Sequence, residues 1–152
     1  MTAKERALAM LDRRDYSRAE LLRKLREKGV DETEAAEAVE RLVELGFVDD
    51  ARYAPIIVRH CAAKGYGPQR VRQELLRRGI PKELWDEAMA QLPVQDDTID
   101  RLLRSRLKSL HPDRAELKKA SDYLLRRGYG WDEIRSALAR YDAEIEEEQD
   151  YG

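Results

Sequence analysis

Two histidines, two aspartate pairs and two glycine-rich turns are the residues whose types could support catalysis or metal binding. His60 and His111 lie far apart, and neither has a cysteine or a second histidine at metal-ligand spacing. Asp49-Asp50 and Asp96-Asp97 could supply carboxylate ligands, but acids at the start of a helix explain both pairs better. We therefore expect no catalytic residues, no metal site and no cofactor, and a protein that is not an enzyme.

The glycine-rich turns resemble fragments of a phosphate-binding loop. They are Gly65-Tyr66-Gly67-Pro68 and Gly128-Tyr129-Gly130-Trp131. No strand pattern precedes either turn, and no Lys-Ser/Thr pair follows, so connections between helices account for the glycines. Tyr66 and Trp131 remain candidates for stacking on a base or on a partner protein, whereas Trp85 falls at an inward position and is expected in the core.

The basic residues are the more promising signal for function. They crowd the second half of the chain at spacings that place them on helix surfaces, where they could neutralise DNA phosphates or meet an acidic protein groove. The alternative is a solvated helix surface with many ion pairs. We favour binding for the cluster as a whole. The candidate contact residues, for DNA or for a protein partner, are Arg59, Lys64, Arg70, Arg77, Arg78, Arg101, Arg104, Arg106, Lys108, Lys118, Lys119, Arg126 and Arg127.

The elements that must position these cations form an internal repeat marked by three glycines. Gly29, Gly79 and Gly128 each follow a helical pattern with a leucine four positions earlier, and each is followed by an apolar residue. A glycine there suits the left-handed conformation just past a helix end. Apolar residues six, ten and thirteen positions after each glycine predict one face of the next helix. The aligned sets are Ala35, Val39 and Leu42, then Trp85, Met89 and Leu92, then Ile134, Leu138 and Tyr141.

Another helix precedes each of these aligned pairs. We predict these three helices over about 3–14, 51–64 and 97–110, with Leu110 among the apolar residues of the last one. Ser17 and Glu20 form a capping-box pattern, Asp49 or Asp50 can cap the helix that follows, and Pro68 suits a first helical turn.

The whole pattern predicts an all-α fold of three tandem three-helix repeats, about nine helices. We place the repeats at 1–46, 47–95 and 96–144, with an acidic tail at 145–152. Because stacked repeats contact mainly their neighbours, we expect an elongated and curved molecule.

The charge is divided along the chain, although the formal net charge of the 152 residues is only -2. Residues 1–50 hold 10 Lys/Arg against 13 Asp/Glu, residues 51–95 hold 8 against 4, and residues 96–141 hold 11 against 8. Six acids and no base follow from Asp142. The basic middle would attract polyanions, and the acidic end could compete for that surface or add solubility.

The remaining features indicate a cytoplasmic protein. Cys61 is the single cysteine and falls in an apolar helical stretch, so we expect a small buried side chain and no internal disulfide. Lys4, Glu5 and Arg6 interrupt any apolar run at the start, so no signal peptide is expected. No stretch reaches the roughly 20 apolar residues that cross a bilayer, so no membrane partner is expected.

Several of these motifs together resemble the signature of RecX regulatory proteins. The central part is the run from Leu45 to Ala54 (LGFVDDARYA), followed by Gly65-Tyr66-Gly67-Pro68 and then by the run from Leu75 to Ile80 (LLRRGI). Tyr16-Ser17 with Glu20-Leu21 is similar to the family's first-unit motif. The third unit, through the run from Leu124 to Tyr129, is similar but looser, and the likeness extends over about residues 3–141.

The resemblance implies a modulator of the RecA recombinase, acting in recombination, DNA repair and the SOS response. It implies that the chain binds RecA–DNA filaments and mainly inhibits them, with weaker binding to single- or double-stranded DNA on its own. Nothing in the sequence suggests a large exposed apolar dimer face, so we expect a monomer, although the oligomeric state stays open. Both capping of the filament and binding along its groove stay open. The alternative from the residues alone is a sequence-nonspecific DNA-binding helical module, whose affinity should fall steeply with salt.

Overall fold

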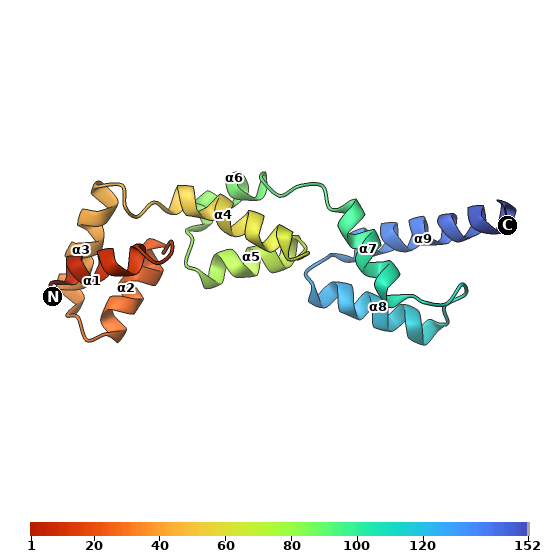
Figure 1. Cartoon of the computed structure of the whole chain (residues 1–152), viewed down its shortest axis with the longest axis horizontal. Helices are drawn as coiled ribbons and strands as arrows, with labels where there is room; N and C mark the ends of the chain where they lie inside the picture. The colour runs from red at the N-terminus through yellow and green to blue at the C-terminus, as the bar shows by residue number, and fades with distance from the viewer. Residues whose placement is uncertain (152) are drawn as a thin grey trace. The chain divides into compact units, whose positions relative to one another are not determined.

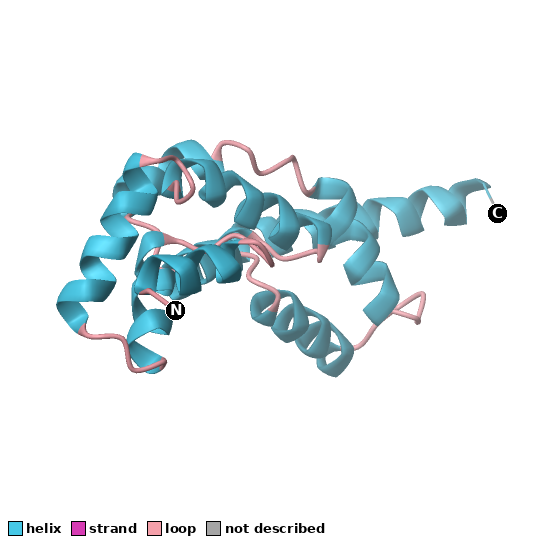
Figure 2. Ribbon diagram, turned by 60° about the vertical axis from the view of Figure 1, so that its left-hand side comes forward, coloured by secondary structure: helices cyan, strands magenta, loops and turns pink. Residues whose placement is uncertain are grey.

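The computed structural model describes residues 1–151, and within them every regular element is a helix (Figure 1). The nine α-helices and one short 3₁₀ helix of these residues are α1 (Ala3–Leu11), α2 (Arg18–Glu27), α3 (Glu32–Glu44), α4 (Asp50–Ala63), α5 (Pro68–Arg77), η1 (Lys82–Leu84), α6 (Trp85–Met89), α7 (Asp96–Arg106), α8 (Arg114–Arg126) and α9 (Trp131–Tyr151). Only helices and connecting loops are drawn in Figure 2, so the predicted all-α class of nine helices is confirmed.

The helices form two compact units. The first comprises Met1–Val58 with Gln73–Gln91, and the second comprises Arg59–Arg72 with the described residues from Leu92 onward. Helices α4 and α5 each begin in one unit and end in the other.

The core of the first unit lies among α1, α2 and α3, where amphipathic faces of short helices pack together. Leu21, Leu25 and Leu42 are fully buried there, and the other buried members of this cluster are Ala7, Met10, Ala35, Val39 and Val48. The leucines are those that the repeat pattern places inward.

The core of the second unit lies among α7, α8 and α9. Leu124, Tyr129 and Ile134 are fully buried, and the other buried members are Ile99, Leu103, Leu107, Ala120 and Ala137. Tyr129 occupies the position that follows the repeat glycine, so the third repeat uses an aromatic ring where the second uses Ile80.

The three repeat glycines end their helices in the same way. Gly29, Gly79 and Gly128 have φ of 86°, 73° and 99°. At each turn the amide of the following residue donates to the leucine carbonyl five residues earlier, as from Tyr129 to Leu124 at 3.1 Å, which is the Schellman arrangement. The predicted helix ends are confirmed.

The helix starts also follow the sequence signals. Ser17 and Glu20 form the complete capping box of α2. The carboxylate of Asp49 accepts a hydrogen bond from the amide of Arg52 at 3.2 Å and so caps α4. Pro68 is the first residue of α5, where its missing N–H costs nothing.

The predicted end of the helix over 97–110 is wrong, because α7 ends at Arg106. Leu107 is extended, with φ of -108° and ψ of 102°, yet its side chain stays buried. Leu110 lies in the loop and is 63% exposed. The hydroxyl of Tyr141 lies 3.2 Å from the carbonyl oxygen of Ser109 and 3.4 Å from that of Leu107, so a distant helix provides the loop with a hydrogen bond that periodicity does not reveal.

Two further elements differ in length from their counterparts. In the second repeat the third helix is only η1 and α6, where Trp85 is half-buried and its indole N–H donates to the carbonyl of Ile80 at 2.9 Å. Helix α9 instead continues through the acidic tail to Tyr151, while residue 152 of that predicted tail lies outside the described residues. Across the described chain no helix has the length and apolar character to cross a membrane.

Candidate nucleic-acid and protein interface

Most of the thirteen predicted contact residues lie on the surface. Eleven are exposed, and only Arg78 and Arg127 are half-buried. Their hydrogen bonds and ion pairs separate them into three groups: cations without a counter-charge, cations paired on the surface, and cations engaged in contacts between repeats.

Three cations of the first group line a basic groove between the end of α7 and the face of α8. We call it the α8 basic groove. Its volume is about 340 Å³, and it is lined by Arg106, Lys119, Ala120, Asp122, Tyr123 and Arg126. Lys119, Tyr123 and Arg126 are three or four residues apart, so one face of α8 presents all of them.

The cations of this groove are available to an anion. Lys119 and Arg126 are exposed and make no ion pair or hydrogen bond with any described residue. The guanidinium of Arg106 lies over the Tyr123 ring at 3.8 Å from its centroid, which orients it without neutralising its charge. A guanidinium offers several N–H donors to phosphate oxygens and an ammonium offers a compact charge, so the groove can hold a phosphodiester.

Four further predicted cations are exposed without a hydrogen bond or ion pair from their side chains to the described part of the chain. They are Arg59, Lys64, Arg101 and Lys108. These residues add positive charge to the second unit but are not among the residues that line the α8 basic groove.

The second group is paired on the surface. Arg104 lies 3.4 Å from Glu144 of α9, and Lys118 lies 2.9 Å from Asp122 one turn along α8. Both pairs are well exposed, so each contributes well under about 1 kcal/mol to stability but lowers the net charge available to an anion.

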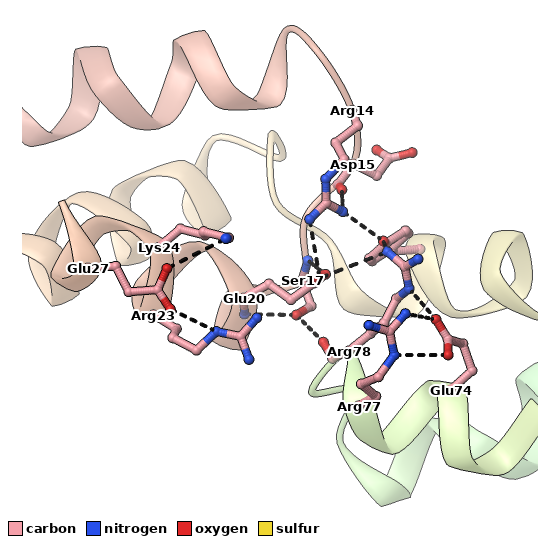
Figure 3. A network of polar contacts seen from close by, with 11 residues as sticks. Arg14, Asp15, Ser17, Glu20, Arg23, Lys24, Glu27, Glu74, Arg77 and Arg78 are labelled. Atoms are coloured by element: carbon pink, nitrogen blue, oxygen red, sulfur yellow. Dashed lines mark hydrogen bonds and ion pairs between the residues drawn. The ribbon is translucent and has the colours of Figure 1, made fainter.

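Arg77 and Arg78 belong to a polar network of the first unit (Figure 3). Arg77 makes two hydrogen bonds to the Glu74 carboxylate, from Nε at 3.0 Å and from Nη2 at 2.5 Å. Arg78 donates to the same carboxylate at 3.0 Å and to the Tyr53 hydroxyl at 2.8 Å. Glu74 therefore neutralises part of the charge that the sequence analysis assigned to binding.

Two acids of this network have unusual environments. Hydrogen bonds from Arg77, aided by Arg78, lower the pKa of Glu74 to about 2 despite its partial burial. Glu20 is only 7% exposed; it accepts from the Ser17 amide at 3.1 Å and lies 3.4 Å from Arg14 and 3.9 Å from Arg78. The buried carboxylate is stable there because hydrogen bonds and cations replace its water shell.

In the second unit Arg127 and Arg70 lie against one tyrosine. Their guanidinium carbons are 4.6 Å and 4.9 Å from the centroid of the Tyr66 ring. Arg127 also donates to the carbonyl of Lys64. The ring that was a candidate for stacking on a base thus already contacts two cations, whereas Trp131 is 55% exposed.

Backbone contacts between two glycine turns fix this cluster. The amide of Gly67 donates to the carbonyl of Arg127 at 2.8 Å, and the amide of Gln69 donates to that of Gly128 at 3.0 Å. A Cβ on Gly67 would lie 2.6 Å from the carbonyl of Gly128, so only glycine fits. The buried Tyr129 hydroxyl donates to Gly65 at 2.9 Å, and burial raises its pKa to about 12.

The first unit contains the equivalent contact. Ser17 stands twelve residues before Gly29, as Gly67 stands twelve before Gly79. The Ser17 hydroxyl donates to the carbonyl of Arg78, and a Cβ on Gly79 would lie 2.6 Å from that of Ala19. We call both contacts repeat joints: the start of one repeat's second helix meets the glycine turn of the next repeat. The sequence analysis missed this role of Arg78 and Arg127, because it depends on how one repeat packs on the next.

Comparison with known proteins accounts for the three repeats of this chain. Three family models match in order: the first, second and third RecX three-helix domains, over residues 3–42, 49–89 and 95–138. The regulatory protein RecX of Stenotrophomonas maltophilia is 44% identical over 144 residues, covering 93% of this chain and 87% of its own. The chain belongs to the RecX family. RecX of Xanthomonas oryzae is 41% identical over 147 residues, covering 94% of this chain and 89% of its own.

Solved structures share the fold. The crystal structure of RecX from Lactobacillus salivarius superposes with a TM-score of 0.82 at 23% identity, covering 93% of this chain and 95% of that one. A second crystal structure of a regulatory protein RecX gives 0.80 at 23% identity, covering 90% of this chain and 70% of that one. RecX proteins are regulatory proteins and not enzymes, and the resemblance stated from the sequence motifs is confirmed.

Proposed function

We propose that this RecX chain binds RecA–DNA filaments and mainly inhibits the recombinase and ATPase activities of RecA in recombination and DNA repair. The proposal rests on membership in a family of regulatory proteins together with the resemblance of its motifs, which implies RecA as the partner. The α8 basic groove is the observation that links this role to DNA, because its unpaired cations suit a phosphate backbone.

Within this proposal the α8 basic groove contacts the DNA of the filament. Lys119 and Arg126 supply the charge, and Arg106 is held over Tyr123 at a fixed orientation. Arg77 and Arg78 contribute less, because Glu74 neutralises part of their charge. On naked DNA a groove with three cations would bind weakly, since few phosphates are neutralised at once.

Paired substitutions on α8 test the groove. Lys119→Gln with Arg126→Gln removes two unpaired cations, and Lys118→Gln is the matched control because Lys118 is already paired with Asp122. Filament binding, measured by fluorescence anisotropy on RecA-coated labelled DNA, should weaken about tenfold or more for the double variant and change little for the control. The slope of log K against log salt should also become shallower by about one to two units.

The alternative function is a sequence-nonspecific DNA-binding module, which the same unpaired cations favour. It predicts that RecA does not increase the affinity for DNA. The wild-type chain would bind naked and RecA-coated DNA with equal affinity, and the double variant would bind both more weakly by the same factor. Stronger binding to RecA-coated DNA at the same salt concentration supports the filament proposal.

A further inference from the structure

The described residues include five helix ends of the Schellman type, and one of them departs from the others. In each, a glycine with positive φ is followed by an apolar or aromatic residue whose amide donates to a carbonyl five residues earlier. Four of these following side chains, Val30, Tyr66, Ile80 and Tyr129, are buried or half-buried. The fifth, Phe47, is 52% exposed.

An exposed Phe47 is unusual for its position. The residue after the glycine of a Schellman turn commonly packs back onto its own helix. Phe47 keeps the backbone bond, 2.9 Å to the carbonyl of Leu42, but half of its surface faces solvent. Leu45, two residues earlier, is 44% exposed, and a Cβ on the intervening Gly46 would meet nothing within 4 Å. Single exposed apolar residues are ordinary, but two within three residues, on an open turn, form a small apolar tip.

The charges beside this tip are acidic in sum. The face of α3 that leads to it carries a shallow groove lined by Ala36, Glu37, Glu40, Arg41 and Glu44. Arg41 pairs with Glu44 at 3.1 Å and Arg18 pairs with Glu40, whereas Glu37 has no cationic partner within the described residues. One further cation, Arg52, donates to the carbonyl of Gly46 at 3.4 Å. On the other side of the tip, Asp49 is exposed and caps α4. We call Leu45, Phe47 and this acidic border the α3 tip.

We propose that the α3 tip is a docking site for a protein surface in which an apolar socket is bordered by Lys and Arg. Resting on the proposed function, that protein is the RecA subunit of the filament. Around the tip five acids outnumber three bases, so the net charge disfavours phosphate and an anionic lipid surface. The acids are Glu37, Glu40, Glu44, Asp49 and Asp50, and the bases are Arg18, Arg41 and Arg52. An aromatic anchor within a charged border is the usual composition of an interface hot spot.

This assignment separates the two kinds of contact within the chain. The α8 basic groove carries contacts with phosphate, and the α3 tip carries contacts with protein. The opposite charges of residues 1–50 and 51–141 agree with that division.

Phe47→Ala tests the site, with Leu76→Ala as the control, because Leu76 is 62% exposed in the same unit and lacks the acidic border. Binding of each variant to RecA-coated DNA and to naked DNA is compared, with thermal unfolding to verify the fold. We expect Phe47→Ala to bind the filament at least about tenfold more weakly, to bind naked DNA as the wild type does, and Leu76→Ala to retain both activities. Glu37→Lys, which reverses the unpaired acid, should also weaken filament binding.

A photo-crosslinking experiment measures which protein lies next to the tip rather than how tightly the chain binds. With p-benzoylphenylalanine at position 47, irradiation of the filament complex should yield an adduct with the RecA protein, and the same group at position 76 should not. Wild-type chain that fails to bind the filament would overturn the proposed function. Wild-type chain that binds, with Phe47→Ala equal to Leu76→Ala and no adduct at position 47, would overturn the docking site alone. Adducts only with a second copy of the chain would assign the tip to self-association and also overturn it.

Discussion

At the residue scale, the structure shows that equal charges in the sequence have different availability. Lys118 and Lys119 are neighbours, yet Lys118 is paired with Asp122, whereas Lys119 lies in a groove and has no ion pair with a described residue. Arg77 is the most exposed guanidinium of its network, but its two hydrogen bonds to Glu74 fix its position and neutralise part of its charge. A list of cations therefore overestimates the binding surface, because ion pairing depends on side-chain directions that residue type alone does not give.

Protonation of Glu74 should make the first unit less stable in acid. Its pKa is lowered to about 2 by Arg77 and Arg78, so its contribution to stability is complete above the ordinary glutamate value and is lost as the pH falls from about 4.5 to about 2. Glu74→Gln should lower the free energy of unfolding at pH 7 by about 1–2 kcal/mol, a value reduced for the solvent screening of the exposed Arg77. Urea denaturation at pH 7 and at pH 3 measures this.

Glu83→Gln is the control for that prediction, because Glu83 is exposed and makes no ion pair with the described residues. The difference between Glu74→Gln and wild type should shrink at pH 3. A difference that stays constant between pH 7 and pH 3 would show that Glu74 does not act through its ionised form.

At the element scale, local sequence signals predicted much of what the structure shows. The glycine turns, the buried leucines before them and the capping box are each encoded within a few residues, and each is confirmed. The early end of α7 and the network around Glu20 were not predicted. Both depend on contacts from distant residues, Tyr141 in one case and Arg78 in the other, which helical periodicity does not contain.

The candidate binding site could be predicted only in part for the same reason. The basic character of α7 and α8 follows from composition, but the groove needs Arg106 placed over Tyr123 across two helices. The engagement of Arg78 and Arg127 in repeat joints also needs the packing of one repeat on the next within each unit.

At the repeat joint of the second unit, replacing a glycine should destabilise the fold through a steric clash, whereas at an open turn only backbone strain should contribute. Gly67→Ala places a Cβ against backbone atoms at 2.6 Å, which no side-chain rotation can relieve, whereas Gly29→Ala meets nothing within 4 Å and suffers only its φ of 86°. Gly67→Ala should cost about 2–4 kcal/mol of stability and Gly29→Ala about 1–2 kcal/mol, in chemical denaturation of each variant. Equal losses would mean that the two glycine turns can separate without cost.

At the scale of the whole molecule, the chain combines three related domains with unequal charge. The first fifty residues are acidic in sum and carry the α3 tip, and residues 51–141 are basic in sum and carry the α8 basic groove. The acidic segment after Asp142 continues α9, and its Glu144 forms an ion pair with Arg104. Under the proposed function, neither kind of contact alone would be sufficient, because specificity for a protein–DNA filament comes from binding both components together.

The most direct test is a titration of RecA ATPase activity on single-stranded DNA with this chain, with binding to the same DNA measured in parallel without RecA. The account predicts that ATP hydrolysis is inhibited at concentrations well below those at which the chain coats naked DNA. Inhibition that begins only where the DNA is already covered, or hydrolysis that is unchanged at excess chain, would contradict the filament-directed role.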